Sequence, residues 1–483
     1  MMLYTKGIKE LSLLLNKKEV SSEEIVSSFI ERIKIKDKVI NSYITIDEQL
    51  LLQQAKESDR RRAQGKALSP FDGIPIAVKD NINTKGVRTT CASKILENFV
   101  PPFNATAYEK MLNSGMILLG KTNMDEFAMG SSTENSYFGP TKNPYNIERV
   151  PGGSSGGSAA AVSAFMAPGS LGSDTGGSIR QPAAFCGVTG IKPTYGRVSR
   201  YGLVAFASSL DQIGTFGKKV EDAAILLQII SGYDSKDSTS VNREVNIDYS
   251  KINPDVKNIK IGVPEEYFKG IDSEIKSNIE SKIAELEKLG ASIVPISLKY
   301  TEYAIPVYYL IATAEASSNL ARYDGVKYGY RSQNVTDLLS LYTKTRSEGF
   351  GKEVKRRIIL GTFSLSSGYY DAYYLKALKG RALIINDFRE ALSKVDAIVS
   401  PVTTTTAFPI GDMTDDPLQM YMSDILTISA NLAGIPALSV PTGLDSKGLP
   451  IGLQVMGNHF EEQKIINIAK AVESICNEIS PVD

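Results

Sequence analysis

Histidine is almost absent from this chain: among 483 residues it occurs once, as His459. A mechanism that needs a histidine base, or a metal site built from several histidines, must use that residue or do without it. Cysteine is also scarce, and Cys91, Cys186 and Cys476 lie far apart and form no CxxC pair. This spacing argues against a disulfide framework and against a zinc site, and it fits a protein of the reducing cytoplasm.

Neither sign of charge is in excess, because 54 lysines and arginines balance 54 aspartates and glutamates. A chain without net charge has no overall field that would attract nucleic acid or an anionic membrane. If RNA is a partner, a local patch or another subunit must hold it.

The sequence also lacks a run of about eighteen apolar residues, which excludes a transmembrane helix. Residues 1–15 lack the basic flank and apolar run of a signal or transit peptide, so we expect a cytoplasmic protein without membrane contact.

What the chain has in abundance is glycine beside serine, concentrated in residues 151–180. Two clusters, residues 152–158 and 176–178, flank an alanine-rich segment that suits one short helix. Glycines let main-chain N–H groups approach a ligand, and serine supplies a hydroxyl nucleophile. Acyl transfer needs both, a nucleophile and donors for the developing oxyanion. A flexible linker or a phosphate-binding turn would use the same residue types, but Val162 and Phe165, of a kind usually buried, argue against a linker.

A lysine at the end of a buried strand is the candidate base. Residues 73–78 are apolar and predict a strand that delivers Lys79 and Asp80 at its end. Burial penalises the ammonium form, so the pKa of Lys79 should fall from about 10.4 into the range where a neutral amine acts as a base. The alternative is an ordinary ion pair of Lys79 with Asp80 or another acid. Because the chain has two serine loops and a single histidine, the catalytic interpretation is favoured.

Two short motifs suggest other chemistries. Residues 115–122 match the phosphate-loop pattern GxxxxGK followed by Ser or Thr, which would bind ATP. A phosphate loop follows a strand and precedes a helix, whereas residues 116–119 are themselves predicted to be a strand after a helix.

Residues 152–156 match the GxSxG nucleophile elbow of α/β-hydrolases, with His459 as the required base. An elbow needs a strand before it, and residues 143–151 predict a polar, proline-broken loop, so this stays a minor alternative.

Helical and strand patterns alternate along the rest of the chain. Ser21 and Glu24 form a capping box ahead of an apolar stripe, which predicts an N-terminal helix. Further helices are expected over residues 105–114, 273–289, 308–322, 352–360 and 369–394, and strands over residues 116–120, 259–263, 291–296, 397–399, 437–440 and 451–455. We therefore expect an α/β fold: a single large mixed, mostly parallel β-sheet covered by helices on both faces.

We expect one domain over residues 1–483, since large α/β enzymes reach this length with one extended sheet. Residues 1–70 would form an N-terminal helical layer, and residues 71–232 a core that carries the lysine and both serine loops. Residues 233–258 are polar and charged and predict a mobile surface segment. Residues 259–483 would supply the remaining sheet and further helices.

Longer motifs resemble the amidase signature family. They are GGSSGGSAAA at residues 152–161, GSDTGGSIR at 172–180 and GIKPTYG at 190–196, and Lys79 stands where that family keeps its catalytic lysine. Within the family, the chain resembles the tRNA-dependent glutamine amidotransferases over stretches that run nearly from end to end: residues 120–135, 314–322, 353–357, 367–374 and 430–434. The resemblance implies the amidase signature fold.

The resemblance also implies a catalytic triad. Ser178 would attack the side-chain amide of glutamine, and Ser154, after a cis peptide bond to Gly153, would pass the proton to neutral Lys79. The backbone N–H groups that would bind the oxyanion belong to Thr175, Gly176, Gly177 and Ser178. The chemistry agrees independently, since without a usable histidine a lysine working through a second hydroxyl is the remaining common general base.

A pocket for the amino-acid end of glutamine is implied as well. Arg357 would bind the α-carboxylate, Asp424 would bind the α-ammonium, and Tyr308 would line the pocket. A guanidinium fork suits a carboxylate, and an acid suits an amine. The alternative for each charged residue is a surface ion pair, and Arg356 stays open as an alternative to Arg357.

For the reaction as a whole, the resemblance implies partners. Ammonia would pass to a B subunit, where ATP and magnesium activate glutamate misattached to tRNA(Gln), and a small C subunit would complete a heterotrimer. We expect no cofactor and no metal in this chain, and tRNA held mainly by the B subunit. Glu-tRNA(Gln) and Asp-tRNA(Asn) both stay open as the acceptor.

Two other functions stay open: a stand-alone amidase that hydrolyses small or fatty amides with the same triad, and a non-catalytic scaffold whose glycine-rich loops bind a nucleotide.

Overall fold

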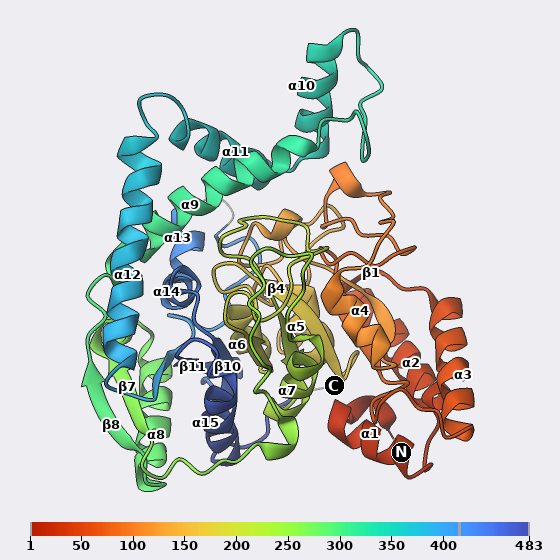
Figure 1. The fold of residues 1–483 in the computed structure, drawn as a ribbon, viewed down its shortest axis with the longest axis vertical. Helices are drawn as coiled ribbons and strands as arrows, with labels where there is room; N and C mark the ends of the chain where they lie inside the picture. The colour runs from red at the N-terminus through yellow and green to blue at the C-terminus, as the bar shows by residue number, and fades with distance from the viewer. Residues whose placement is uncertain (1, 414–416, 482–483) are drawn as a thin grey trace.

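One large sheet runs through the middle of the molecule, with helices α1 to α3 on one side and α12 on the opposite side (Figure 1). The computed structural model describes residues 2–413 and 417–481. Within them, eleven strands pair in the order β1-β3-β2-β4-β6-β5-β10-β11-β9-β7-β8. Their bounds are β1 Tyr43–Thr45, β2 Pro75–Lys79, β3 Ile117–Thr122, β4 Gly169–Asp174, β5 Thr189–Lys192, β6 Gln212–Gly217, β7 Lys260–Pro264, β8 Ser292–Ile296, β9 Ala397–Pro401, β10 Ala437–Leu444 and β11 Pro450–Gly457. The order places the end of the lysine strand, β2, beside the end of β4, which leads into the second glycine cluster.

In the described residues, fifteen α-helices pack around this sheet. Their bounds are α1 Ile8–Asn16, α2 Ser22–Ile40, α3 Glu48–Ala63, α4 Thr106–Asn113, α5 Gly156–Ser163, α6 Arg180–Cys186, α7 Val220–Ile230, α8 Ser273–Lys288, α9 Ala304–Asn319, α10 Leu338–Gly349, α11 Lys352–Ser364, α12 Lys376–Leu392, α13 Pro417–Met422, α14 Ile425–Ala433 and α15 Glu462–Ser474. None of these described helices combines the length and the apolar composition that crossing a membrane requires.

Helices cover both faces of the sheet. Gly169 and Gly172 lie three residues apart on β4 and therefore face opposite sides. A Cβ atom on Gly169 would meet Leu226 of α7, whereas one on Gly172 would meet Ser155, which precedes α5. The expected α/β sheet with helices on both faces is confirmed, and the first serine loop lies on the α5 face.

Parallel and antiparallel pairs occupy separate parts of the sheet. β2 pairs in parallel with β3 and β4, and β7 with β8 and β9, whereas the six other neighbouring pairs are antiparallel. The mixed sheet is as expected, but antiparallel pairs outnumber the parallel pairs that we expected to predominate. A parallel pair needs a long crossover, and α4 and α8 supply one between β2 and β3 and between β7 and β8. Where the connection is short, as at residues 445–449 between β10 and β11, the chain reverses.

Most expected elements are present, but the sequence does not predict the central strand β4. The capping box is confirmed, since Ser21 and Glu24 each accept the other's N–H. The expected helix over residues 369–394 is divided, because Asp371–Leu375 forms a π-helical turn before α12. The β4 sequence, GSLGSD, has little strand propensity. Pairing with β2 on one side and β6 on the other makes it a strand.

The polar segment 233–258 runs along the surface and contains one 3-10 turn, Tyr249–Lys251. Asp234 accepts hydrogen bonds from the Thr106 and Ser199 hydroxyls, both at 2.6 Å. Asp237 accepts the Arg200 N–H at 2.7 Å. These bonds tie the segment to the core, and its mobility stays a prediction.

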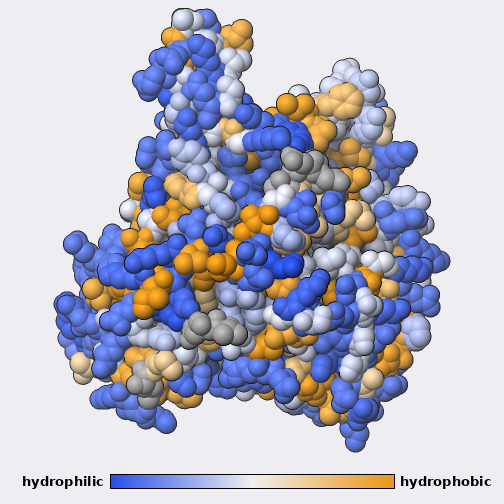
Figure 2. Space-filling view, turned by 180° about the vertical axis from the view of Figure 1, so that it is seen from behind, coloured by the Kyte–Doolittle hydropathy of each residue, from blue (hydrophilic) through white to orange (hydrophobic). Residues whose placement is uncertain are grey.

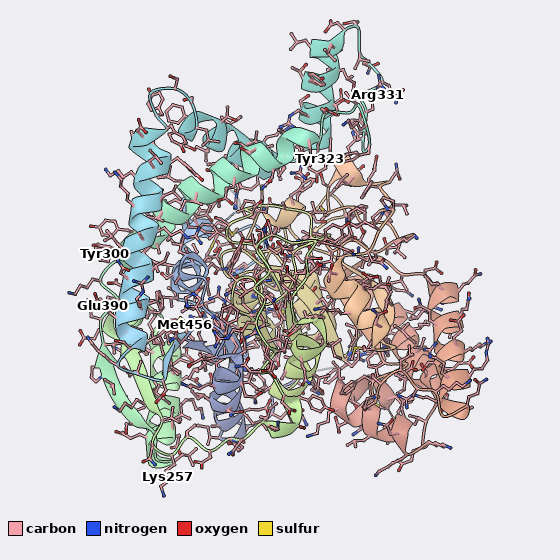
Figure 3. The ribbon with its side chains drawn as sticks, in the orientation of Figure 1. Lys257, Tyr300, Tyr323, Arg331, Glu390 and Met456 are labelled. Atoms are coloured by element: carbon pink, nitrogen blue, oxygen red, sulfur yellow. The ribbon has the colours of Figure 1, made fainter. Side chains whose placement is uncertain are left out.

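One part of the molecule projects beyond the rest. α10 and the loop before it stand out above α9 and α11 (Figure 1), and Figure 2 shows this projection as mostly hydrophilic with a few hydrophobic residues at its tip. Tyr323 lies at its base and Arg331 lies in its loop (Figure 3). The rings of Tyr323, Phe127 and Phe350 pack together there, with centroids 5.1 to 6.2 Å apart. This aromatic cluster anchors the projection where α10 passes into α11.

Candidate active site

Lys79 lies at the centre of a buried group of hydroxyls. It is the last residue of β2, and its side chain is fully buried. Its Nζ lies 2.8 Å from the Oγ atoms of Ser154 and Ser155 and 2.9 Å from that of Ser173. The structure therefore brings the predicted base into direct contact with the first serine loop and with β4.

Burial, not an ion pair, sets the protonation of Lys79. Loss of hydration lowers its pKa to about 7, although nearby buried aspartates act in the opposite direction. In the described part of the chain, no carboxylate lies within ion-pairing distance of the Lys79 Nζ. Asp80 instead lies 3.3 Å from the Nζ of Lys121. The expected depression of the pKa is confirmed, and the ion pair between Lys79 and Asp80 is not found.

The hydrogen bonds around Lys79 distinguish the three serines. Ser155 Oγ donates to the Ser173 carbonyl at 2.9 Å, so toward Lys79 it can only accept. Ser173 Oγ accepts from the Asn81 side chain at 2.9 Å. Ser154 Oγ has no partner besides Lys79 in the described structure. A neutral amine has one lone pair, and Ser154 is a hydroxyl that is free to donate a proton to it.

Glycines shape the loop that presents Ser154. The Gly153–Ser154 peptide bond is cis, as expected, and Gly152 has a φ of +83°. The Gly153 N–H donates to Gln181 Oε1 at 2.9 Å. A Cβ atom on Gly153 would overlap the Asp125 carboxylate. Only glycine fits directly before Ser154 without displacing its neighbours.

A buried aspartate holds the second serine loop. Asp174, the last residue of β4, accepts the N–H groups of Gly177 at 2.9 Å and Ile179 at 3.0 Å, on either side of Ser178. Burial alone would raise the pKa of Asp174, but Arg180, 3.2 Å away, lowers it to about 2. The carboxylate therefore stays ionised and fixes the backbone around Ser178, whose surface is 8% exposed.

The two serine loops touch each other, because the Ser155 N–H donates to the Ser178 carbonyl at 3.3 Å. Of the four N–H groups expected to bind an oxyanion, that of Gly177 is already bonded to Asp174. The other three donate to no acceptor in the described structure: Thr175, Gly176 and Ser178. These three N–H groups are available to an oxyanion, and that of Gly177 is not.

Arg357 is enclosed by aromatic rings. Its guanidinium carbon lies 5.3 Å from the ring centroids of Tyr309 and Tyr421 and 5.6 Å from that of Phe206. Its Nε donates to Glu353 at 2.8 Å, whereas its two terminal nitrogens donate to no acceptor in the described structure. The guanidinium fork is therefore free for an anion.

The neighbouring arginine differs in burial and in partners. The Arg356 side chain is 32% exposed, against 3% for Arg357. It binds the other oxygen of Glu353 at 2.6 Å, whereas the cation–π contacts with the enclosing rings in the described structure belong to Arg357. The geometry therefore favours Arg357 over Arg356 as an anion ligand in a pocket.

Asp424 and Tyr308 lie beside the second serine loop. Burial raises the pKa of Asp424 to about 7. The Ser131 hydroxyl donates to its Oδ2, whereas its Oδ1 is buried and has no hydrogen-bond partner among the residues that the structure describes. Thr427, three residues on, donates to the Gly176 carbonyl at 2.7 Å, and a Cβ atom on Gly176 would lie 2.8 Å from the Tyr308 ring. The pocket thus holds a buried carboxyl oxygen that is available to a hydrogen-bond donor.

The phosphate-loop match at residues 115–122 and the GxSxG match at residues 152–156 do not form the sites that these motifs predict. Lys121 lies within β3, is fully buried, and donates to Thr89 at 2.7 Å, so the phosphate-loop interpretation is wrong. Residues 143–151 form turns and isolated bridges instead of a strand. The ring of His459 bonds to the Ala433 carbonyl at 3.1 Å, and burial lowers its pKa. The nucleophile-elbow interpretation is therefore wrong as well.

The structure adds residues that the sequence does not single out. Ser155 and Ser173 contact Lys79, Asp174 and Gln181 hold the serine loops, and Glu353 holds Arg357. The first four lie within or directly beside the glycine and serine motifs, which is the only signal that could have found them. Glu353 lies four residues before Arg357, the spacing at which side chains on a helix meet.

Comparison with known proteins supports one family over nearly the whole chain. The family model described as Amidase matches residues 24–466. A relative from Caldanaerobacter subterraneus subsp. tengcongensis, named as the A subunit of glutamyl-tRNA(Gln) amidotransferase, is 58% identical over 474 residues, which cover 98% of this chain and 97% of the relative. A protein of the same name from Persephonella marina is 59% identical over 471 residues, 97% of each.

Solved structures give the same result. The crystal structure of the glutamyl-tRNA(Gln) amidotransferase A subunit from Thermotoga maritima has a TM-score of 0.82 and 46% identity, covering 99% of this chain and 97% of that chain. The peptide amidase from Stenotrophomonas maltophilia has a TM-score of 0.83 and 30% identity, covering 97% of this chain and 96% of that chain. The match of the family model and these full-length similarities show that the chain belongs to the Amidase family.

Proposed function

We propose that this chain is the glutamine-hydrolysing subunit of a glutamyl-tRNA(Gln) amidotransferase of the cytoplasm. The proposal depends on two buried groups with unused hydrogen-bonding atoms in the described structure, the terminal nitrogens of Arg357 and the Oδ1 of Asp424. The carboxylate and the ammonium of an amino acid would satisfy both. Its side-chain amide would then extend toward Ser178. The name carried by the full-length relatives supports the same activity.

In this proposal the reaction starts from the neutral amine of Lys79. Lys79 takes the proton of Ser154, which takes the proton of Ser178 as the Ser178 Oγ attacks the δ-carbon of glutamine. The carbonyl oxygen becomes an oxyanion that accepts hydrogen bonds from the backbone N–H groups of Thr175, Gly176 and Ser178. The proton returns to the nitrogen, the C–N bond breaks, ammonia leaves, and a γ-glutamyl ester remains on Ser178. Water then cleaves the ester, releasing glutamate and restoring the hydroxyl.

Replacing Arg357 by alanine is expected to raise the KM for glutamine by about 10- to 150-fold, because hydrogen bonds to charged groups contribute roughly 1.5–3 kcal/mol. The kcat should change much less. Hydrolysis of propionamide, which lacks the α-carboxylate, should stay within about threefold of the parent. Steady-state ammonia release from both substrates tests this.

Arg356→Ala is the matched control, since it removes the neighbouring arginine that binds the same Glu353. It should leave the constants for both substrates within about threefold of the parent. A stand-alone amidase for small or fatty amides would lose the same factor on glutamine and on propionamide in Arg357→Ala. That result would refute the glutamine pocket and favour the alternative function.

We further propose that a partner B subunit uses the ammonia and holds ATP, magnesium and most of the tRNA, with a small C subunit completing a heterotrimer. The balanced charge of this chain and the relatives' names, which describe them as one subunit of an amidotransferase, support this division.

A tagged chain purified from its own cells is expected to carry two further proteins. Only that complex should convert Glu-tRNA(Gln) to Gln-tRNA(Gln) with glutamine and ATP; conversion by the chain alone would contradict the proposal. Asp-tRNA(Asn) is the second acceptor for the same assay.

A further inference from the structure

Glu126 is a buried carboxyl that the proposed reaction does not use. It lies in the 3-10 turn Glu126–Ala128 after β3 and is 4% exposed, and burial raises its pKa to about 7. The Ser93 hydroxyl donates to its Oε1, and the Gly351 N–H donates to its Oε2 at 2.8 Å. A side chain of the core is therefore bonded to the start of α11, 225 residues further along the chain.

The start of α11 depends on this outside acceptor. Gly351 is the N-cap residue, and without a side chain it cannot cap the helix itself. The first N–H groups of a helix need acceptors, and the positive end of the helix dipole favours a carboxylate there. Glu126 provides one. Arg357 lies on the same helix, six positions after Gly351 and less than two turns from the cap.

The junction between α10 and α11 fits closely against the core. A Cβ atom on Gly351 would overlap the Glu126 carboxyl, and one on Gly349 would overlap Ile95. Between these glycines, Phe350 is 3% exposed and belongs to the aromatic cluster at the base of the projection. The backbone of the junction therefore lies directly against the Glu126 side chain.

We propose that Glu126 is a positioning residue for glutamine: by capping α11, it holds Arg357 where the guanidinium fork meets the α-carboxylate. This inference rests on the proposed role of Arg357. Glu353, in the first turn of α11, holds the Arg357 Nε, so a shift of the helix start moves both groups together. Lys79 and Ser178 lie on other elements, β2 and the loop after β4, and a shift of α11 leaves them in place.

Glu126→Ala removes the cap and is expected to raise the KM for glutamine by about 5- to 30-fold, the effect of a lost helix cap. The kcat for glutamine and the hydrolysis of propionamide should change less than about twofold. Glu126→Gln keeps an oxygen for the Gly351 N–H and should stay within about threefold of the parent. Glu126→Asp retains the charge but is one methylene too short, and it should raise the KM like alanine. The aspartate variant decides the question if the alanine variant does not fold.

The double variant with Arg357→Ala separates this inference from the proposed function. If Glu126 acts through Arg357, then Glu126→Ala in the Arg357→Ala background should leave the KM unchanged. Additive increases would overturn the inference, as would equal losses on glutamine and propionamide in Glu126→Ala. If Arg357→Ala alone leaves the KM for glutamine unchanged, the proposed pocket fails. If Arg357→Ala raises the KM for glutamine but Glu126→Ala and Glu126→Asp leave it unchanged, the positioning role fails and the pocket stands.

Discussion

Replacing Ser178 by alanine is expected to abolish ammonia release from glutamine, with kcat falling by about 10,000-fold or more, because the covalent route loses its nucleophile. The fold should survive the change. Asp174 holds this loop through the N–H groups of Gly177 and Ile179, and the Ser178 hydroxyl takes no part in those bonds. Ammonia release, followed in a coupled glutamate dehydrogenase assay, measures the loss.

Ser393→Ala is a suitable control, since Ser393 is exposed at the end of α12. It should keep full activity. Both variants should unfold within about 2 °C of the parent, as expected for a hydroxyl that holds no buried group. Undiminished glutamine hydrolysis by the Ser178 variant would exclude Ser178 as the nucleophile and leave Ser154 as the candidate.

The second large effect is expected at Lys79. Lys79→Met should lower kcat by about 1,000-fold or more, because proton transfer through Ser154 loses its acceptor. The parent should show a kcat/KM that rises with pH to a plateau, with its midpoint near the pKa of Lys79, which burial lowers to about 7. Methionine fills the space of the lysine side chain as far as Cε and lacks only the amine, so the serine loops should stay in place.

The sign of this pH dependence follows from the neutral amine. Below pH 7 the ammonium form predominates and the base is lost, which by itself should lower kcat/KM about tenfold per pH unit. Asp424, whose pKa burial also raises to about 7, acts in the same direction through binding of the α-ammonium. Propionamide has no ammonium group, so its profile reports Lys79 without Asp424. A propionamide profile that stays flat down to pH 5 would contradict a lysine base.

Local sequence determined the chemistry of this protein. A single histidine, two clusters of glycine and serine, and an apolar strand that ends at Lys79 were enough to predict a lysine base and a serine loop. These features are local, because residue type sets the available chemistry and a short apolar run predicts burial. The resemblance added Arg357, Asp424 and Tyr308, and the structure buries all three, with Tyr308 against Gly176 of the second serine loop.

Only the tertiary structure decided which groups share the site. Ser173 contacts Lys79 because β4 pairs with β2, and no pattern in GSLGSD predicts that pairing. The sequence does not distinguish Arg357 from Arg356, because they are neighbours of the same residue type. The structure does, because the Arg357 side chain is buried and that of Arg356 is partly exposed. Strand direction and the hydrogen bond from the start of α11 to Glu126 likewise depend on groups distant in sequence. Burial and long-range pairing are properties of the whole packed chain, and no local stretch specifies them.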